Sequence, residues 1–136
     1  MSDPFDDNEI LEALYKEAQE DFNLSVMNIS EKTREISTIK NKWLYRIVKE
    51  ESLLSKMKEL QSQMISKIAA FSRNTKNTAL KAKTEEFKQE ELTELSDQIK
   101  KQEEAVKFLR LLLDNQVKSF TWDVRNAIEQ LKLESN

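Results

Sequence analysis

Apolar residues recur three and four positions apart over most of this chain, a spacing that places side chains on one face of an α-helix. The first such run consists of Ile10, Leu11, Leu14 and Ala18. Pro4 suits a first helical turn, and the acidic residues beside it suit the positive end of a helix. The pattern predicts a short helix that begins near Asp3 or Asp7 and ends at about Asp21, followed by a polar hinge around Asn23.

A much longer apolar stripe follows this hinge. Its members are Ile36, Ile39, Trp43, Ile47, Leu54, Met57, Leu60, Met64, Ile68 and Phe71. Glu50 and Glu51 interrupt the stripe once. A helix from about residue 25 to 73 would be on the order of 70 Å long. It would end in "SRNTKNT", where Asn74 and Asn77 are the residues best able to form a left-handed C-cap without glycine.

The last stripe runs from residue 92 to 131 in a near-heptad pattern with a single gap at Gln102. Its apolar members are Leu92, Leu95, Ile99, Val106, Leu109, Leu113, Val117, Phe120, Val124, Ile128 and Leu131. We expect one helix here, with residues 79–90 forming either its extension or a short separate helix. Two long helices joined at "SRNTKNT" would fold back on each other. The predicted fold is therefore all-α: a long-helix antiparallel hairpin with a short N-terminal helix.

A hairpin of this kind buries only one seam on each helix. Several apolar residues lie beside the main stripe and are expected to stay exposed in a monomer: Trp43, Leu44, Val48, Leu53 and Ile65. Apolar surface of this extent usually finds a partner. We therefore expect assembly into a helical ring or bundle. The residues expected at the oligomer interface are Trp43, Leu44, Ile47, Leu113, Val117, Phe120, Trp122 and Ile128.

The chain contains no cysteine, no histidine and no glycine. These absences exclude a disulfide framework or thiol nucleophile, an imidazole base or ligand, and every glycine-dependent phosphate loop. Carboxylates alone could perform acid–base chemistry only in a shaped, partly desolvated pocket, and the sequence predicts none. We expect a protein that is not an enzyme and that uses no cofactor and no metal.

The sequence predicts neither a membrane-spanning segment nor a signal peptide. No run approaches the roughly 20 apolar residues of a membrane span. The N-terminus, "MSDPFDDNE", is acidic and lacks the basic start and apolar stretch of a signal peptide. The apolar stripes are also too narrow for a helix that lies on a membrane surface. We expect a cytoplasmic protein.

Charge is unevenly distributed along the chain. Residues 1–31 hold nine acids and one base, residues 32–88 hold fourteen bases and six acids, and residues 89–136 hold seven bases and ten acids. The segment charges of −8, +8 and −3 sum to the net charge of −3. A basic middle in an acidic chain is typical of a protein with a polyanion-binding face, although charge runs also occur as ordinary solvated surface.

The basic middle contains a segment without any acidic residue, residues 60–84, which we call the acid-free window. Its five cations are Lys67, Arg73, Lys76, Lys81 and Lys83. Cations among hydroxyl and amide side chains suit contacts to phosphate. Phe71 lies within the segment and Phe87 follows it, and both could stack on bases, although the position of Phe71 on the stripe favours a core role. A ring of chains would multiply these charges into a basic rim.

Three short motifs resemble a known family. "NKWL" at Asn41–Leu44, "LLLD" at Leu111–Asp114 and "VRNAIE" at Val124–Glu129 are similar to motifs of the UvsY family, the recombination mediators of tailed phages. The resemblance covers roughly residues 10–133. It implies an all-helical hexamer or heptamer that binds single-stranded DNA. It also implies that the protein loads a RecA-like recombinase onto DNA covered by single-strand-binding protein, in the host cytoplasm if the chain is phage-encoded.

The DNA-contacting motif of that family is of the Leu-Lys-Ala-Arg type, and two registers are open for it here. "LKAK" at residues 80–83 resembles the motif but lies further beyond Trp43 than the family pattern places it. The register that keeps Trp43 aligned puts Ser66 and Ile68 at the basic positions, with Lys67 adjacent. Both registers fall inside residues 60–84, so DNA binding is predicted for the acid-free window as a whole.

These observations divide the chain into an acidic N-terminal arm or short helix, residues 1–22, and a helical hairpin domain for oligomerisation and DNA binding, residues 23–136. Lys42 and Arg46 either extend the basic face or form ion pairs with Glu50. The alternative function is a coiled-coil scaffold or adaptor with no nucleic-acid role. A scaffold usually interleaves both charges on its exposed faces, so the acid-free window favours the DNA-binding interpretation.

Overall fold

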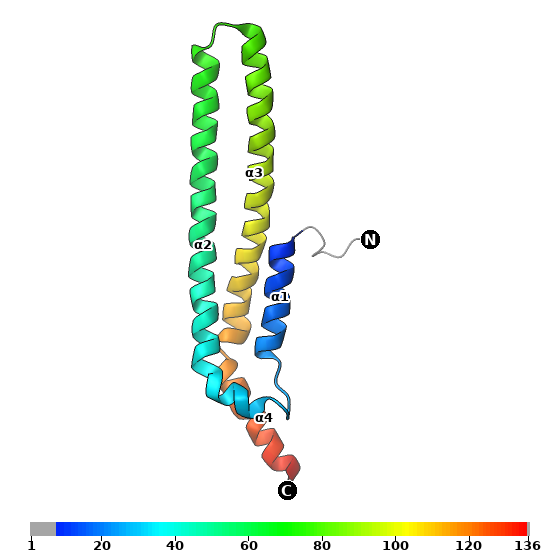
Figure 1. Ribbon diagram of the computed structural model, residues 1–136. Coiled ribbons are helices and arrows are strands. Elements are labelled where there is room, and N and C mark those ends of the chain that lie inside the picture. The colour runs from blue at the N-terminus through cyan, green and yellow to red at the C-terminus, as the bar shows by residue number, and fades with distance from the viewer. Residues whose placement is uncertain (1–7, 136) are drawn as a thin grey trace.

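The computed structural model describes residues 8–135, and within that range the chain forms helices and short connections without any β-strand. The predicted all-α class is confirmed (Figure 1). No helix in this range combines the length and the apolar character needed to cross a membrane. The elements in chain order are α1 (Glu9–Phe22), α2 (Ile29–Asn74), α3 (Thr78–Leu112), the short π-helix η1 (Leu113–Val117) and α4 (Phe120–Ser135).

Helices α2 and α3 lie side by side and run in opposite directions, joined at the upper end of the molecule by residues 75–77 (Figure 1). Polar contacts connect them along their length. Gln61 Nε2 donates to Ser96 Oγ at 2.8 Å, and Lys58 Nζ lies 3.5 Å from a Glu103 carboxylate oxygen. With 46 residues, α2 is about 70 Å long. We refer to these two helices as the α2–α3 pair.

The connection at residues 75–77 does not use the left-handed cap that the sequence suggested. No residue that the structure describes has a positive φ, so the expectation for Asn74 and Asn77 is wrong. Helix α2 ends at Asn74, and the next residue, Thr75, is extended (φ −95°, ψ 123°). Asn77 instead caps the following helix, since its side-chain oxygen accepts a hydrogen bond from the backbone N–H of Leu80 at 3.1 Å. Residues 79–90 therefore belong to α3 and do not form a separate helix.

Helix α1 begins where a side chain can satisfy its free N–H groups. The side-chain oxygen of Asn8 accepts a hydrogen bond from the backbone N–H of Leu11 at 3.1 Å. The start predicted among residues 3–7 lies outside the described residues. The helix ends at Phe22, and Asn23 adopts an extended conformation, which confirms the predicted hinge.

A single helix over residues 92–131 is not what the structure shows. Helix α3 ends at Leu112, and in η1 the backbone N–H of Lys118 donates to the carbonyl of Leu113, five residues earlier, at 3.1 Å. Leu112 and Val117 are both buried. A π-turn accommodates buried side chains five positions apart, which an α-helix would place on different faces. Helix α4 continues from this turn to the lower end of the molecule (Figure 1).

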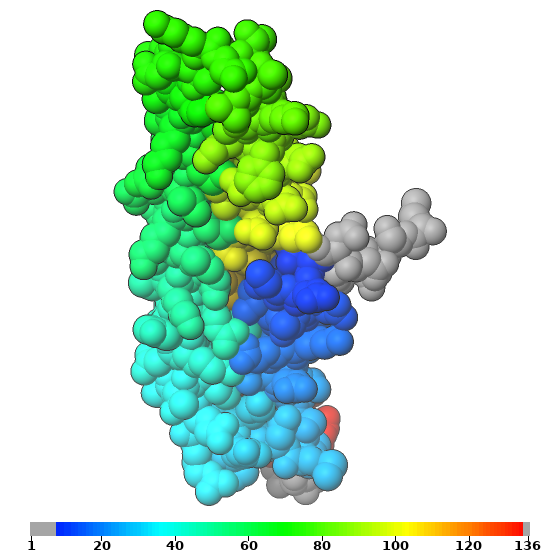
Figure 2. Space-filling view, turned by 45° about the horizontal axis from the view of Figure 1, so that its top comes forward, coloured from blue at the N-terminus to red at the C-terminus, as the bar shows by residue number. Residues whose placement is uncertain are grey.

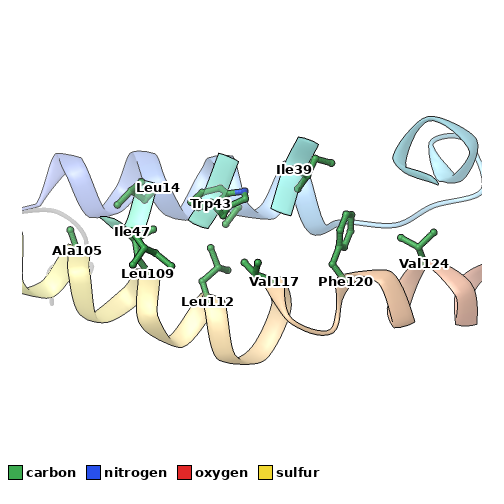
Figure 3. Close-up of a cluster of buried hydrophobic side chains, with 11 residues drawn as sticks. Leu14, Ile39, Trp43, Ile47, Ala105, Leu109, Leu112, Val117, Phe120 and Val124 are labelled. Atoms are coloured by element: carbon green, nitrogen blue, oxygen red, sulfur yellow. The ribbon is translucent and has the colours of Figure 1, made fainter. Parts of the chain in front are cut away.

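The hydrophobic core lies in the lower half, where all the helices meet (Figure 1), and Figure 3 shows its side chains. Its buried members are Leu14, Ala18, Ile39, Trp43, Ile47, Ala105, Leu109, Leu112, Val117, Phe120 and Val124. Helix α1 contributes Leu14 and Ala18 and so packs into the same core as the long helices. The expectation that Trp43 stays exposed in a single chain is wrong, because its side chain is 0% exposed.

Candidate nucleic-acid interface

The acid-free window forms the upper end of the α2–α3 pair (Figure 1). Residues 60–74 are the last turns of α2, and residues 78–84 are the first turns of α3. Because the chain reverses at residues 75–77, these two stretches lie side by side. The fold therefore gathers all five cations of the window at one end of an elongated molecule.

The cations of the window have no acidic partners. Lys67, Arg73, Lys76 and Lys83 are exposed, and Lys81 is half-buried. Within residues 8–135, no carboxylate lies within 4.0 Å of any of the five. None of the five charges is therefore neutralised by a direct ion pair within the described residues, which favours an anionic ligand at the tip.

Ion pairs between helices occur further down the molecule. They join Lys42 to Asp21 and Glu17, Arg46 to Glu17, Arg110 to Glu51, and Lys58 to Glu103. Lys58–Glu103 is the one nearest the tip among the described residues. Exposed ion pairs contribute only about 0–1 kcal/mol each to stability. Their absence from the window therefore costs the fold little and leaves its cations available to an anionic ligand.

One aromatic residue lies within reach of these cations. Phe87 is 60% exposed and sits one helical turn after Lys83 in α3. Leu80, also in the first turns of α3, is 53% exposed. Phe71 is half-buried, as its place on the apolar stripe predicts. Phe87 is thus the aromatic side chain that could stack on a base.

A shallow groove of about 610 Å³ lies between α2 and α3, partly within the window. Aliphatic and small side chains of α2 line one wall, among them Ile65, Ile68 and Ala69. Glu85 and Glu86 of α3 lie on the other wall. Two carboxylates make this groove unsuitable for phosphate. The candidate interface is therefore the exposed cationic surface of the window and not the groove.

Lys42 and Arg46 do not extend the basic face. The two guanidinium nitrogens of Arg46 donate to the two carboxylate oxygens of Glu17 at 2.6 and 3.2 Å. Lys42 forms an ion pair with Asp21 and lies 3.5 Å from Glu17. Both cations also lie 5.4 Å from the centroid of the Trp43 ring. These contacts hold the acidic helix α1 on α2.

Most residues predicted at an oligomer interface lie inside this chain. Four are buried in the core: Trp43, Ile47, Val117 and Phe120. Two are half-buried and pack against it: Leu113 and Ile128. Two are exposed, by 42% and 64%: Leu44 and Trp122. These residues are buried within one chain because α1 and the turn at η1 cover apolar surface that a two-helix hairpin would leave exposed.

Gln102 was visible in the sequence only as a gap in the last stripe. In the structure its side chain is 2% exposed, and Nε2 donates to the carbonyl oxygen of Glu50 at 3.1 Å and to its carboxylate at 2.6 Å. The alternative ion pair of Glu50 with Lys42 or Arg46 does not form, because those cations pair with Glu17 and Asp21. The sequence did carry a signal for this contact: the gap of the second stripe includes Glu50, the gap of the last stripe is Gln102, and these two residues meet in the structure. The hydrogen bonds of the buried Gln102 to the half-buried Glu50 favour one register of the α2–α3 pair.

Asn8 is a second buried polar residue that the sequence did not single out. Its side chain is 2% exposed, and Nδ2 donates to the carbonyl of Lys101 at 3.0 Å and to the carboxylate of Glu104 at 3.2 Å. It also caps α1, so one side chain fixes both where α1 begins and where it sits on α3.

Comparison with protein-family models, with curated proteins and with solved structures gives no match. The three short motifs of the sequence lie in different elements, in α2, across α3 and η1, and in α4. Each contributes a residue to the same core: Trp43, Leu112 and Val124. These motifs therefore support the fold, and the DNA-binding hypothesis depends on the separate acid-free window.

Proposed function

We propose that this protein is a recombination mediator that binds single-stranded DNA through the acid-free window. In this proposal it promotes loading of a RecA-like recombinase onto a strand covered by single-strand-binding protein. The observation that carries the DNA-binding step is the group of five cations, without acidic partners, at the exposed tip of the molecule. The partner proteins come from the resemblance of the sequence motifs.

The chemistry of the tip suits a single strand better than a duplex. Lysine and arginine side chains on two helices contact phosphates without reading bases. Phe87 offers an aromatic face to an unpaired base beside Lys83. The bases of a duplex are already stacked on each other and cannot use that face. We therefore expect a preference for single strands and little dependence on sequence.

A salt titration with fluorescent single-stranded DNA and a matched duplex tests this proposal. The affinity for the single strand should exceed that for the duplex. It should also fall steeply with salt, by roughly 0.7 in the log–log slope for each phosphate contact. Equal affinity for both DNAs, or binding that salt does not weaken, would contradict a phosphate-contacting single-strand site.

Self-association is part of the proposal, with the hairpin of α2 and α3 as the building block of a hexameric or heptameric ring. Large apolar side chains are exposed on the lower half of α2 and on α4. Leu44 and Val48 lie one turn apart and are 42% and 66% exposed, and Trp122 is 64% exposed. A ring joined through this end would present several acid-free windows along one rim and raise the affinity for a long strand.

Light scattering at micromolar concentration should give a mass more than twice the 16.0 kDa of one chain. Trp122→Ala should shift the mass toward smaller species, because Trp122 is the largest exposed apolar residue on α4. Met27→Ala, at a 97% exposed position in the α1–α2 connection, is the control and should leave the mass unchanged. A parent protein that is monomeric at these concentrations would exclude the ring.

A coiled-coil scaffold without a nucleic-acid role remains the competing function, and exposed apolar residues on the upper half of the α2–α3 pair favour it. Leu60, Leu80 and Phe87 are 49%, 53% and 60% exposed. A scaffold would use these side chains to bind another helix. It would show no salt-dependent binding of single-stranded DNA, so the same titration separates the two functions.

A further inference from the structure

Helix α1 occupies only the lower half of one face of the α2–α3 pair. On the α2 side, Glu17 of α1 pairs with Arg46. On the α3 side, the ring of Tyr15 lies 6.2 Å from that of Phe108. The upper limit of α1 is Asn8, which is anchored beside Lys101. Figure 2 shows α1 in blue against the lower part of the molecule, with α2 in green and α3 in yellow meeting above it.

The uncovered continuation of this face carries apolar residues at heptad spacing from the α1 contacts. Phe87 and Leu80 lie three and four heptads before Phe108 in α3, and Leu60 lies two heptads after Arg46 in α2. Seven residues are nearly two helical turns, and the less exposed positions of α3 recur at this spacing from Gln102 to Lys81. Residues at heptad spacing therefore keep their place relative to α2, and these side chains lie on the side of the pair that carries α1. We call this region, above Lys101, the upper face.

The positions of α3 that face α2, which we call seam positions, explain why these apolar side chains stay exposed. The buried residues Leu95 and Gln102 face α2, and the same heptad position further up is held by Lys88 and Lys81, both half-buried. The α2–α3 contact thus takes lysine stems at its upper end. Phe87 and Leu80, each one residue before a seam position, remain exposed.

Charge on the upper face changes sign about Phe87. Lys83 lies one turn before it and Glu91 one turn after it, on the same side of α3. Further toward the tip is Lys76, and further down are Glu94 and Asp97. A second α3, rotated about a two-fold axis through Phe87, would place its Glu91 opposite Lys83 and its Lys83 opposite Glu91. The surface is self-complementary in this orientation.

We propose that the upper face is a docking surface for a second copy of this chain. The two copies pack antiparallel, α3 against α3, with both Phe87 rings at the two-fold axis and Lys83 of each copy beside Glu91 of the other. Only the part of α3 above α1 takes part, so the contact is smaller than the roughly 800 Å² per partner of a standard interface. Pairing is therefore weak, and salt weakens it further.

This pairing regulates DNA binding if the proposed function holds, because it uses cations of the acid-free window. A phosphate bound at Lys83 would lie beside the carboxylate of the partner's Glu91, and the two anions repel each other. Single-stranded DNA and the second copy therefore compete for the upper face. Paired chains are the DNA-free state, and a bound strand separates them.

Crosslinking tests the geometry directly, since the chain has no cysteine of its own. Phe87→Cys loses the aromatic ring but keeps both Lys83–Glu91 contacts of the pair. It should therefore still give a covalent dimer with a short bismaleimide, because the two thiols would lie at the axis. Gln89→Cys is the matched control: it is exposed and two residues away, but it lines the groove of the other face. Circular dichroism checks that both variants stay helical. Equal crosslinking of the two variants, or none at Phe87→Cys, overturns the proposal.

Charge reversal in the Phe87→Cys background tests the pairing of Lys83 with Glu91. K83E and E91K alone should each reduce crosslinking several-fold, since each brings like charges together at both contacts. The combined K83E/E91K variant should recover it, because both contacts are again of opposite charge. A combined variant that crosslinks no better than the single ones overturns the proposal.

Single-stranded DNA added before the crosslinker should reduce the dimer of Phe87→Cys. The DNA-free crosslink does not depend on the proposed function. If charge reversal behaves as expected and DNA has no effect on the dimer, self-pairing stands and the DNA-binding proposal fails at this surface. If neither the crosslink nor its rescue is seen, self-pairing fails while the salt titration still decides DNA binding.

Discussion

Replacing Trp43 with alanine should lower the free energy of unfolding by about 3–5 kcal/mol. The indole is 0% exposed and packs 6.0 Å from the ring of Phe22, measured between centroids. Its Nε1–H donates to a carboxylate oxygen of Asp21 at 2.7 Å. Truncation opens a cavity between α1 and α2 and removes the hydrogen bond that ties them. Because domains of this kind have stabilities of about 5–15 kcal/mol, the loss is a large fraction of the total.

The chain supplies its own control for this substitution. Trp122→Ala makes the same chemical change at a 64% exposed position and should cost about 0.5 kcal/mol or less. Trp43→Phe keeps most of the ring volume but loses the donor to Asp21, and should fall in between, at about 1–2 kcal/mol. Urea unfolding followed by circular dichroism, at concentrations where all variants have the same mass, measures these differences. Similar costs for the two alanine variants would contradict the burial of Trp43.

The effect of Trp43 on assembly should be indirect. From the sequence we expected Trp43 at a contact between chains. In the structure α1 covers it, with Lys42 and Arg46 on its ring and Asp21 on its nitrogen. Loss of the indole should loosen α1 first. A change in oligomer mass in Trp43→Ala would follow from that loosening, whereas Trp122→Ala acts on an exposed surface.

Helix limits were well predicted because hydrophobic spacing is a local property of the chain. The second helix, expected from about residue 25 to 73, is Ile29–Asn74. The break at residues 75–77 falls inside "SRNTKNT", since this is where apolar spacing stops. The break at η1 was missed because a heptad pattern tolerates one inserted residue. Its signal is the five-residue step between Leu112 and Val117, which only burial makes visible.

Packing of α1 could not be predicted, because it depends on contacts between residues far apart in sequence. Its apolar face, with Leu14 and Ala18, fits any seam of suitable width. The position at which α1 packs is set by Asn8, Glu17 and Asp21, whose partners lie in α2 and α3. Counted along the chain, those carboxylates form an acidic arm. In three dimensions Glu17 and Asp21 compensate the cations of α2.

The acid-free window, in contrast, could be identified from the sequence because it is one continuous run without an acidic residue. The run includes the end of α2, the connection and the start of α3. Because the chain reverses at the connection, the two helical parts of the run lie next to each other. Lys42 and Arg46 show the limit of such counting. They look as free as Lys81 and Lys83 in the sequence, yet they are paired with α1.

Removal of all five cations of the window should nearly abolish binding of single-stranded DNA. The variant replaces Lys67, Arg73, Lys76, Lys81 and Lys83 with alanine. If each contacts one phosphate, its affinity at 0.15 M salt should fall on the order of 10³-fold per chain engaged, since each contact releases about 0.7 counterion. The log–log salt slope should become shallower by about 3.5 for the same reason. Replacing only Lys81 and Lys83 should give a smaller loss and a smaller change in slope.

A control variant with the same change in net charge separates a site from a general field. It replaces five exposed cations outside the window that form no ion pair among the described residues: Lys49, Lys56, Lys100, Lys107 and Lys132. Alanine is a good helix former, so both variants should keep their helicity and their mass. Fluorescence anisotropy at matched salt should show a large loss for the window variant and a small one for the control. If the folded window variant binds as tightly as the parent, or the control loses as much, the window is ordinary solvated surface. The exposed Leu60, Leu80 and Phe87 would then indicate a helical scaffold.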